Sequence, residues 1–430
     1  MDRRDFIKAS VVAGFTCLTD WEKAFALGMK DPQAGRKWKG WKKGEFHIHF
    51  IYTGVAESMF LIFPDGTTML LDCGDHAAIT RLALAVPVKP GPERLAGDWI
   101  ARYVQRVNPN GADVDYMELS HFHCDHAGTP LWQTRKVENW DRKHDYYRSG
   151  FALAAETLHF KKAIDRGWPD YNEPIPAFAP GSLPVLDHMK KLYAWIGKRD
   201  GLVVEKIRLG ARDQIVPLRN AAAAKGFEVF NLCANGKYVR KDGTIRDLYA
   251  EPISCGKPAF LNENGMSIGH IFTYGKFKLY AAGDFSDRPR VSNGRLVIED
   301  EIAEAVPKVN VAKVNHHAHY SMPAKLVAAL APQVWTVCVW DQLHNIAEVM
   351  ERMADRSLYP GDRIICPGIF PRERRDEDAG RPWLGTVHPS AFQGGHVVVN
   401  VAPGGDTYTV NYLTAEDESM TVRSVLSFTS

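Results

Sequence analysis

The stretch His121-Phe122-His123-Cys124-Asp125-His126 decides the fold. It follows a short β-like run over residues 115–120 and leads into a loop that contains Gly128. Side chains at positions i and i+2 of an extended chain project to the same side, so His121 and His123 can hold one cation. Asp125 and His126 come just past the predicted strand end, where a turn can direct them at a second position. Such ligands suit zinc, with iron or manganese as alternatives, and an exposed His-rich loop is the less favoured interpretation.

This hexapeptide is the HxHxDH signature of the metallo-β-lactamase superfamily, and other segments of the chain resemble that superfamily too. Residues 68–74, Thr-Met-Leu-Leu-Asp-Cys-Gly, resemble its strand-end Asp-x-Gly. The resemblance implies that Asp72 orients a ligand histidine from behind. Residues 279–284 close a hydrophobic strand with a Gly-Asp pair, which resembles the family's bridging carboxylate. Asp284 is therefore the candidate link between two metal ions.

Further motifs resemble the branch that includes the extracellular domain of competence-type DNA-uptake proteins and choline-phosphoesterase-like enzymes. The opening hairpin of that branch is matched by residues 54–58 with 64–67, and its Asn/Ser-rich segment by residues 262–267. Other branches carry a metal-binding histidine in the latter segment. Residues 313–318 resemble its K-V-x-H-H-G, and Leu343-His344 its later histidine before an amphipathic helix.

One departure from that branch concerns the residues after the double histidine. Ala318-His319-Tyr320-Ser321 replaces the usual Gly-Ser, so the contacts of this loop differ from those of the branch. The resemblance as a whole covers about residues 45–130 and 255–360. Residues 130–250 have no counterpart in it.

The resemblance implies two metal sites. One contains His121, His123 and a histidine of the 316–317 pair; the other contains Asp125, His126 and His344, with Asp284 bridging. Neighbouring residues on extended backbone face opposite sides, so we expect only one of the pair to ligate. We favour His317, which leaves His316 to face the substrate as a donor, and we expect Asp125 to accept a proton as well.

Several other residues are weaker candidates for the site. His270 is either a substitute for the absent motif histidine or, preferably, a packed strand residue. Cys124 is expected to point away from the metals by strand alternation. The remaining weaker candidates are His319, His47 and His49.

The composition is that of an ordinary folded protein. The 430 residues are 45% hydrophobic and 24% charged, which excludes disordered, collagen-like and coiled-coil chains. With 53 basic and 51 acidic side chains, the formal charge of +2 provides no global field for nucleic acid or acidic membranes. No apolar run approaches the roughly 20 residues that a membrane span requires.

The N-terminus resembles a twin-arginine export signal. Residues 2–8 read Asp-Arg-Arg-Asp-Phe-Ile-Lys, an apolar stretch follows over 9–18, and Ala24-Phe25-Ala26 offers a cleavage site. The alternatives are an amphipathic first helix and, given a poor lipobox, a lipid anchor at Cys17. We therefore expect a periplasmic or secreted protein that starts near Leu27. Six cysteines would remain, and their irregular spacing predicts no required disulfide.

The predicted fold is an α/β protein, the αβ/βα sandwich with two mixed sheets face to face and helices outside. Residues 1–26 are the signal, and 27–44 form a basic, aromatic lead-in segment. Residues 45–415 form the domain, and residues 416–430 a C-terminal tail. Within the domain we expect a largely helical insertion over 130–250, placed as a lid, with helical patterns at 147–166 and 186–198. Strands are predicted at 46–52, 58–63, 67–72, 115–120, 266–272, 277–282, 309–314, 334–339, 363–366, 397–401 and 407–412, and a helix over 91–107.

The predicted function is metal-assisted hydrolysis. Two divalent cations about 3.5–4 Å apart would activate a bridging hydroxide. Resemblance favours a phosphoester or phosphodiester substrate, and the balanced charge makes a small molecule more fitting than nucleic acid. A β-lactam or lactone is the second candidate, against which the missing motif histidine counts. A non-catalytic binding module is the third, and the nearly complete ligand set argues against it.

Overall fold

The computed structural model describes residues 34–76, 86–128, 140–141, 146–174, 182–250, 262–286, 290–291, 294–295 and 298–430. The predicted export signal, Cys17 and Cys255 lie outside the described residues. Five cysteines within them are buried and form no disulfide with one another: Cys73, Cys124, Cys233, Cys338 and Cys366. No helix in these ranges has the length and apolar character needed to cross a bilayer.

Two large sheets form the centre of the molecule. The first runs β21 (Val422–Thr429), β20 (Thr407–Leu413), β19 (His396–Val401), β1 (Phe46–Phe50), β2 (Ser58–Ile62), β3 (Thr68–Cys73), β4 (Asp113–Glu118), β7 (His159–Asp165) and β8 (Val203–Lys206). The second runs β11 (Ile245–Asp247), β10 (Lys237–Val239), β9 (Phe227–Ala234), β12 (Gly269–Tyr274), β13 (Phe277–Ala282), β16 (Val311–Lys313), β17 (Val334–Val337) and β18 (Ile364–Pro367). Two short hairpins, β5 (Trp140–Asp141) with β6 (Tyr146–Tyr147) and β14 (Arg290–Val291) with β15 (Gly294–Arg295), stand apart from them.

Each large sheet changes from antiparallel to parallel part-way across. The first is antiparallel from β21 to β3 and parallel from β3 through β4 and β7 to β8. The second is antiparallel from β11 to β13 and parallel from β13 to β18. Carboxyl ends of parallel strands share one edge of a sheet, so the loops that follow β4, β13 and β16 can meet there.

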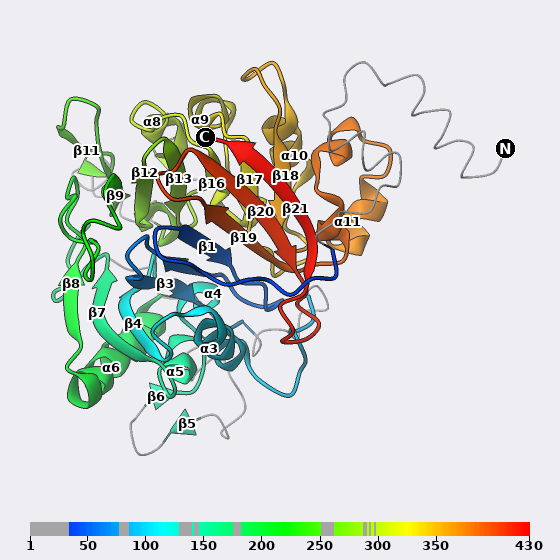
Figure 1. The fold of residues 1–430 in the computed structure, drawn as a ribbon. Helices are drawn as coiled ribbons and strands as arrows, with labels where there is room; N and C mark the ends of the chain where they lie inside the picture. The colour runs from blue at the N-terminus through cyan, green and yellow to red at the C-terminus, as the bar shows by residue number, and fades with distance from the viewer. Residues whose placement is uncertain are drawn as a thin grey trace.

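Helices cover the outer faces of the sheets (Figure 1). On the first sheet lie α3 (Ala96–Val107), α5 (Phe151–Ala154) and α6 (Leu183–Asp200); on the second lie α8 (Ile298–Ile302), α9 (Ala324–Leu330) and α10 (Ala347–Ala354). Shorter segments are α4 (Cys124–Ala127), α11 (Arg372–Glu377), η4 (Asn264–Met266), η5 (Asn315–Ala318), η6 (Pro382–Thr386) and η7 (Pro389–Phe392). The predicted two-sheet sandwich is confirmed.

The side chains of β1 alternate between the space that separates the two sheets and the outer, helix-covered face of the first sheet. Phe46 and Ile48 point between the sheets, where Phe46 packs against Phe272 of β12 with ring centroids 6.2 Å apart. His47 and His49 point to the opposite face, and Tyr103 of α3 bonds His49 there. The period of two thus places alternate residues of one strand in two different layers.

Residues 147–166 differ from the helix predicted for them. Only Phe151–Ala154 is helical, and β7 follows, paired in parallel with β4. Strand pairing overrides the local helical pattern here, as tertiary context often does. Of the rest of the expected insertion, α6 matches a predicted helix, whereas β8 extends the first sheet and β9 to β11 belong to the second.

The C-terminal residues also differ from the tail predicted over 416–430. Val422–Thr429 forms β21, the edge strand of the first sheet, in antiparallel register with β20. Phe428 stacks on Tyr408 with ring centroids 4.9 Å apart. Apolar residues alternate along Val422–Thr429, as in a strand with one buried face. The segment pairs with β20 and is therefore part of the sandwich.

Candidate metal centre

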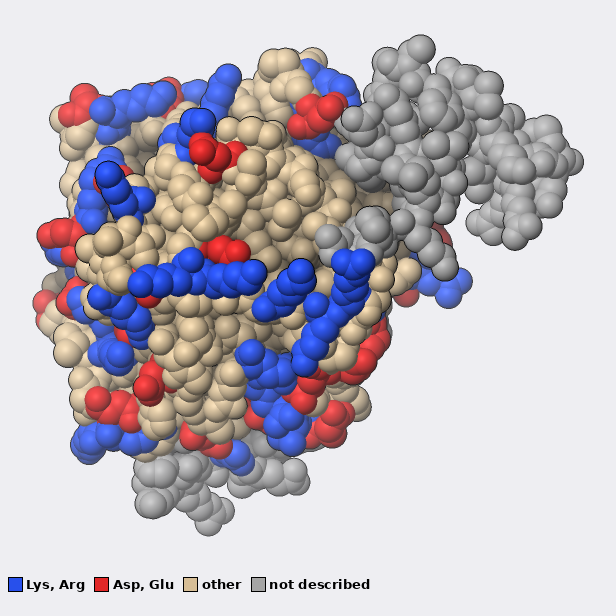
Figure 2. Space-filling view, in the orientation of Figure 1, with Lys and Arg blue, Asp and Glu red and all other residues tan. Residues whose placement is uncertain are grey.

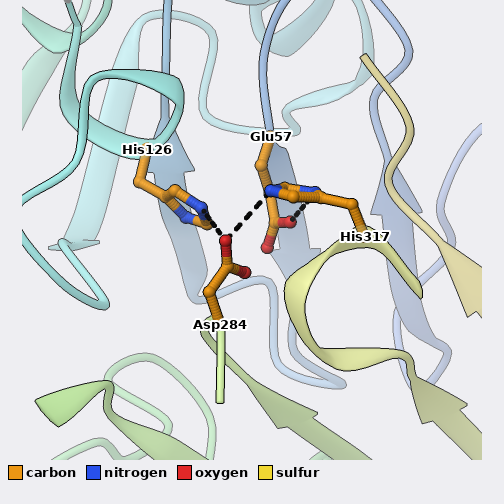
Figure 3. A group of neighbouring side chains, drawn as sticks. All are labelled: Glu57, His126, Asp284 and His317. Carbon is orange, nitrogen blue, oxygen red and sulfur yellow. Dashed lines mark hydrogen bonds and ion pairs between the residues drawn. The ribbon is translucent and has the colours of Figure 1, made fainter. Parts of the chain in front are cut away.

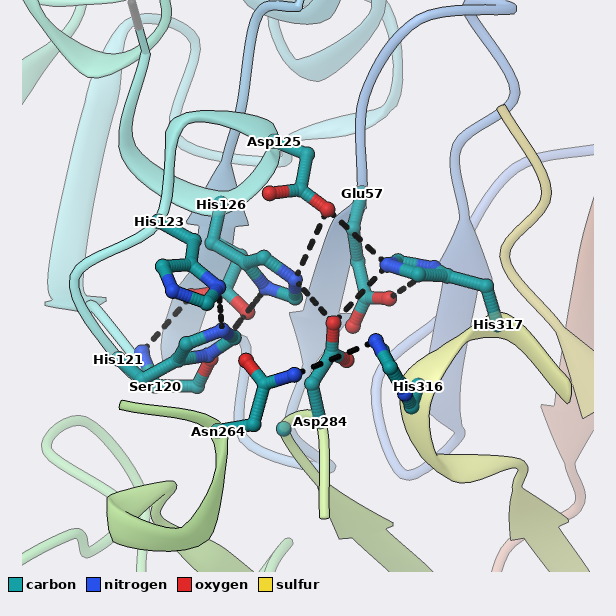
Figure 4. Close-up of polar contacts among 12 residues, drawn as sticks. Glu57, Ser120, His121, His123, Asp125, His126, Asn264, Asp284, His316 and His317 are labelled. Carbon is teal, nitrogen blue, oxygen red and sulfur yellow. Dashed lines mark hydrogen bonds and ion pairs between the residues drawn. The ribbon is translucent and has the colours of Figure 1, made fainter. Parts of the chain in front are cut away.

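The predicted site residues converge where loops leave the ends of strands in both sheets (Figure 4). Asp72 lies in β3, and the HxHxDH segment follows β4. Asp284 comes two residues after β13, and the double histidine lies in η5, directly after β16. Strands of both sheets therefore present these side chains to a common centre.

Four ligand atoms surround the middle of this centre. His126 Nε2 lies 3.0 Å from Asp284 Oδ2 and 3.5 Å from Asp125 Oδ2. His317 Nε2 lies 3.0 Å from the same Asp284 oxygen and 3.1 Å from Asp125 Oδ2. Ligands at zinc distances in a tetrahedron are about 3.3 Å apart. The two nitrogens and two oxygens therefore have the spacing and the chemistry of a zinc ligand set.

A carboxylate stands behind each of the two central histidines. Asp72 Oδ2 is 2.7 Å from His126 Nδ1, and Glu57 Oε2 is 3.2 Å from His317 Nδ1. The backbone oxygen of Cys338 also lies 2.8 Å from His317 Nδ1. A proton held on Nδ1 leaves the Nε2 lone pair directed at the centre, the usual orientation of a ligating imidazole. Asp72 is thus placed behind His126, where it can orient that ring.

Ser120 keeps Asp72 in place. Its backbone amide donates to Asp72 Oδ1 at 2.8 Å, and its hydroxyl donates to Oδ2 at 2.7 Å. Asp72 itself has a left-handed backbone with φ 58°. A non-glycine residue in this region is strained and persists because its surroundings hold it. The strain at this position is consistent with a functional constraint on the carboxylate.

Glu57 belongs to the same group and was missed by sequence reasoning. Glu57, His126, Asp284 and His317 each offer a ligand atom within 4.8 Å of the others (Figure 3). Glu57 Oε1 also lies 2.7 Å from Lys313 Nζ, and both side chains are fully buried. Glu57 faces Lys313 and the Nδ1 side of His317. We therefore assign Asp125 as the fourth ligand and Glu57 as the residue that orients His317. Two motifs could have pointed to this pair: the 54–58 hairpin motif contains Glu57, and the 313–318 motif contains Lys313.

The charges of the centre stabilise one another. Burial opposes ionisation of Asp284, but His126 and His317 hold the pKa of its carboxyl well below its usual range. Burial likewise opposes a charge on His126, yet Asp284 and Asp125 raise its pKa well above the ordinary value. Protons on the imidazoles thus balance the carboxylates, and a divalent cation would displace them on binding.

His121 and His123 come together by a turn, not by the extended chain that we expected. The His123 amide donates to the His121 carbonyl at 3.1 Å, and His121 Nε2 lies 3.1 Å from His123 Nδ1. The ring of His121 is 4.1 Å from that of His126. Cys124 starts α4 rather than alternating along a strand. The two imidazoles can still hold one ion beside the central four atoms.

The double histidine adopts a left-handed backbone. His316, His317 and Ala318 have φ of 46°, 55° and 60°, each in the region that L-residues rarely occupy. The expected extended backbone, with the two rings on opposite faces, is therefore wrong. Both rings face the centre in Figure 4. His317 lies with Asp125 and Asp284, whereas we had grouped it with His121 and His123; His316 Nε2 instead lies 3.2 Å from Asn264 Nδ2.

His344 packs against His317 rather than beside Asp125 and His126 in the arrangement we expected. The two rings stack at 4.6 Å with 11° between their planes. The Trp340 amide donates to His344 Nδ1 at 3.4 Å. Its indole N–H donates to Asp125 Oδ2 at 3.0 Å. The structure thus brings His344 to the edge of the cluster and adds Trp340 to it.

A second buried ion pair supports the HxHxDH loop from outside. Arg166 Nε and Nη2 donate to the two oxygens of Glu263, each at 2.7 Å. Glu263 Oε1 also accepts the Phe122 amide, between His121 and His123, at 2.9 Å. Asn235 Oδ1 accepts from Arg166 at 3.0 Å. Glu263 lies in the 262–267 motif, but no motif marks Arg166, which is 97 positions away.

The weaker histidine candidates lie away from the centre or at its rim. His270 bonds Glu118 at 2.8 Å within the sandwich, as a packed strand residue would. His47 pairs with Glu45 at 3.0 Å and His49 with the Tyr103 hydroxyl at 2.9 Å, on the outer face of the first sheet. His319 is half-buried, with its ring 6.0 Å from that of His344.

We predict that Lys313→Met destabilises the metal-free protein by roughly 3–5 kcal/mol, because it leaves Glu57 buried without its counter-charge. Replacing both partners, with Lys313→Met and Glu57→Gln together, should recover more than about 1 kcal/mol of that loss. Chemical unfolding of the metal-free forms measures both quantities. If the double variant loses as much free energy of unfolding as the two single variants lose together, the two side chains are not coupled.

We also predict that Glu263→Gln weakens zinc affinity by roughly 10–100-fold, the usual effect of losing support behind a ligand. Competition with a chelating dye measures the affinity. Glu304→Gln, at an exposed glutamate that pairs with Lys325, is the matched control. Equal affinities for the two variants would mean that Glu263 does not position the loop.

Comparison with known proteins adds one match. No curated protein matches the chain. A family model described as Metallo-beta-lactamase superfamily matches residues 52–148, a segment that holds Glu57, Asp72 and the HxHxDH residues. The metallo-β-lactamase superfamily match thus covers β2, β3 and β4 of the first sheet and the loops that carry these residues.

Proposed function

We propose that this protein is a metal-dependent hydrolase with two divalent ions, zinc first among them, and a phosphoester or phosphodiester substrate. The observation that carries the proposal is the set of four ligand atoms, two histidine nitrogens with Asp125 Oδ2 and Asp284 Oδ2, at zinc-ligand spacing. The superfamily match and the metal-binding cluster together support the hydrolase class. The phosphoester rests on the motif resemblance over residues 54–58, 262–267 and 313–318.

Two divalent ions bound here would supply Lewis acidity and a water that loses its proton near neutral pH. The residues of the chain then divide the remaining work. Asp284 Oδ2 lies 3.0 Å from both His126 and His317, and Asp284 would be the carboxylate shared by the two ions, as the motif resemblance implies. Asp72 and Glu57 fix the two imidazoles from behind. Asp125 is within reach of both central histidines and is the candidate proton acceptor.

His316 and Asn264 form the side of the centre that we assign to the substrate. Asn264 Nδ2 is a donor only, so at 3.2 Å it leaves His316 Nε2 as the acceptor and the proton on Nδ1. His316 Nδ1 and Asn264 Oδ1 have no hydrogen-bond partner among the described residues. A donor and an acceptor are thereby left for a polar substrate group. Asn264 lies in the segment where other branches of the superfamily carry a metal-binding histidine.

We expect about two equivalents of divalent metal in the purified protein and fewer in Asp284→Asn, because that change removes the shared carboxylate charge. Elemental analysis of both proteins measures this. Asp355→Asn, at an exposed aspartate, is the matched control and should keep its full metal content. A wild-type protein that binds no metal after incubation with zinc would instead support a binding module.

We expect hydrolysis of p-nitrophenyl phosphodiesters or monoesters, lost on chelation and reduced more than about a hundredfold by Asp284→Asn. Nitrocefin and a lactone, tested in parallel, represent the carbonyl alternative. If the phosphoesters stay intact while nitrocefin opens, the metal centre stands but the substrate class is wrong.

A further inference from the structure

Residues Arg36–Lys43, which we name the basic strap, concentrate positive charge on one surface. The segment reads Arg-Lys-Trp-Lys-Gly-Trp-Lys-Lys and contains five cations without an acid. All five cationic residues are exposed, and none forms a salt bridge within the part of the chain that the structure describes. The nearest acid along the chain, Glu45, forms a salt bridge with His47 and accepts the Lys42 backbone amide at 3.0 Å, so this one acid is shared. The positive charge of the strap is therefore free to act on a partner.

Hydrogen bonds fix the backbone of the strap at both ends. Near its start, the Val422 amide donates to the Arg36 carbonyl at 2.8 Å, and the Trp38 amide donates to the Met420 carbonyl at 2.9 Å. Past its end, the Gly44 amide donates to the Pro64 carbonyl at 2.8 Å. The cations thus stand on an ordered backbone, which lowers the entropy that binding would cost.

The two tryptophans of the strap turn toward the protein. The Trp38 ring lies 5.2 Å from His49 and 5.5 Å from His47, both in β1. The Trp41 indole donates to the Glu45 carbonyl at 2.6 Å. Both rings are half-buried and pack against the core on the outer face of the first sheet. Single-stranded nucleic acid is held largely by stacking on aromatic rings, so this geometry argues against it as the partner.

The exposed face is a row of cations. Figure 2 shows Lys and Arg side chains along the course that residues 34–45 follow across the molecule in Figure 1. Beside the start of the strap, Arg102 and Arg106 pair with Glu418. The whole chain carries only +2, and the strap is therefore a strong local asymmetry.

We propose that the basic strap docks this protein on an anionic phospholipid surface. Such a surface presents many phosphates in one plane, which a straight row of cations can contact without a groove. Each basic residue held near it strengthens binding by roughly fivefold. No apolar ring points outward from the strap, so the attachment is electrostatic and peripheral, and salt should release it. The proposal is independent of the metal centre.

The test is co-sedimentation of the full-length protein with vesicles of phosphatidylcholine, with and without phosphatidylglycerol. We expect binding only to the anionic vesicles, lost at high salt and weakened about a hundredfold or more when four strap lysines become glutamine. The changes are Lys37→Gln, Lys39→Gln, Lys42→Gln and Lys43→Gln. A control with the same loss of charge on exposed lysines elsewhere carries Lys198→Gln, Lys225→Gln, Lys241→Gln and Lys308→Gln.

The control variant should bind like the wild type, and both variants should keep the unfolding midpoint and the activity on a soluble substrate. Equal loss of vesicle binding in the two variants would overturn the proposal, because net charge alone would then explain it. Binding to neutral vesicles would do the same. Strap-dependent binding of a labelled single-stranded oligonucleotide, without vesicle binding, would assign the surface to nucleic acid instead.

Discussion

The buried ion pair between Lys313 and Glu57 is the interaction on which the centre depends. Lys313 also donates to the Ala282 carbonyl at 2.6 Å, two residues before Asp284, so it holds the end of β13 as well. The Glu57 amide donates to the Asp125 carbonyl at 2.9 Å, and the Glu57 carbonyl accepts from Gly74. Burial of two charges is tolerable only when each is paired and hydrogen-bonded. This pair joins one sheet to the other at the point where the candidate ligands meet.

Because the two sheets meet at this ion pair, the carboxylates of the centre lie close to one another. Glu57, Asp72, Asp125 and Asp284 are all buried around His126 and His317, and Lys313 is the fully buried cation paired with one of them. Burial opposes a charge on His126 and His317, but the neighbouring carboxylates raise the pKa values of both imidazoles well above the ordinary value. A cluster with this surplus of buried negative charge gains most from a divalent cation. The two supporting carboxylates are stabilised differently, because Asp72 accepts the Ser120 amide whereas Glu57 pairs with Lys313.

The sequence predicted the parts of this structure that local patterns encode. The HxHxDH residues, Asp72, Asp284 and the double histidine were found because each follows or ends a predicted strand. The partners of these residues were not all found, because contacts such as Lys313 with Glu57 or Arg166 with Glu263 join distant segments. Backbone detail was also missed: left-handed φ values at 316–318 depend on surrounding packing, and side-chain periodicity cannot show them. The strand at residues 159–165 was missed for the same reason: its sequence pattern is helical, and its structure depends on parallel pairing with β4, a distant segment.

The two charged regions of the molecule show why a nearly neutral total says little. In the centre, negative charge is buried and its strength comes from the low dielectric around it, so it selects small cations that can lose their water. In the basic strap, positive charge lies in water, where each group contributes little alone and a row is needed for an effect. On the two proposals, a small ion and an extended anionic surface would be recognised by opposite means. The net charge counts the buried acids and the exposed lysines and arginines equally. Burial is what suits the acids to a single metal ion and exposure what suits the basic strap to a surface of many anions.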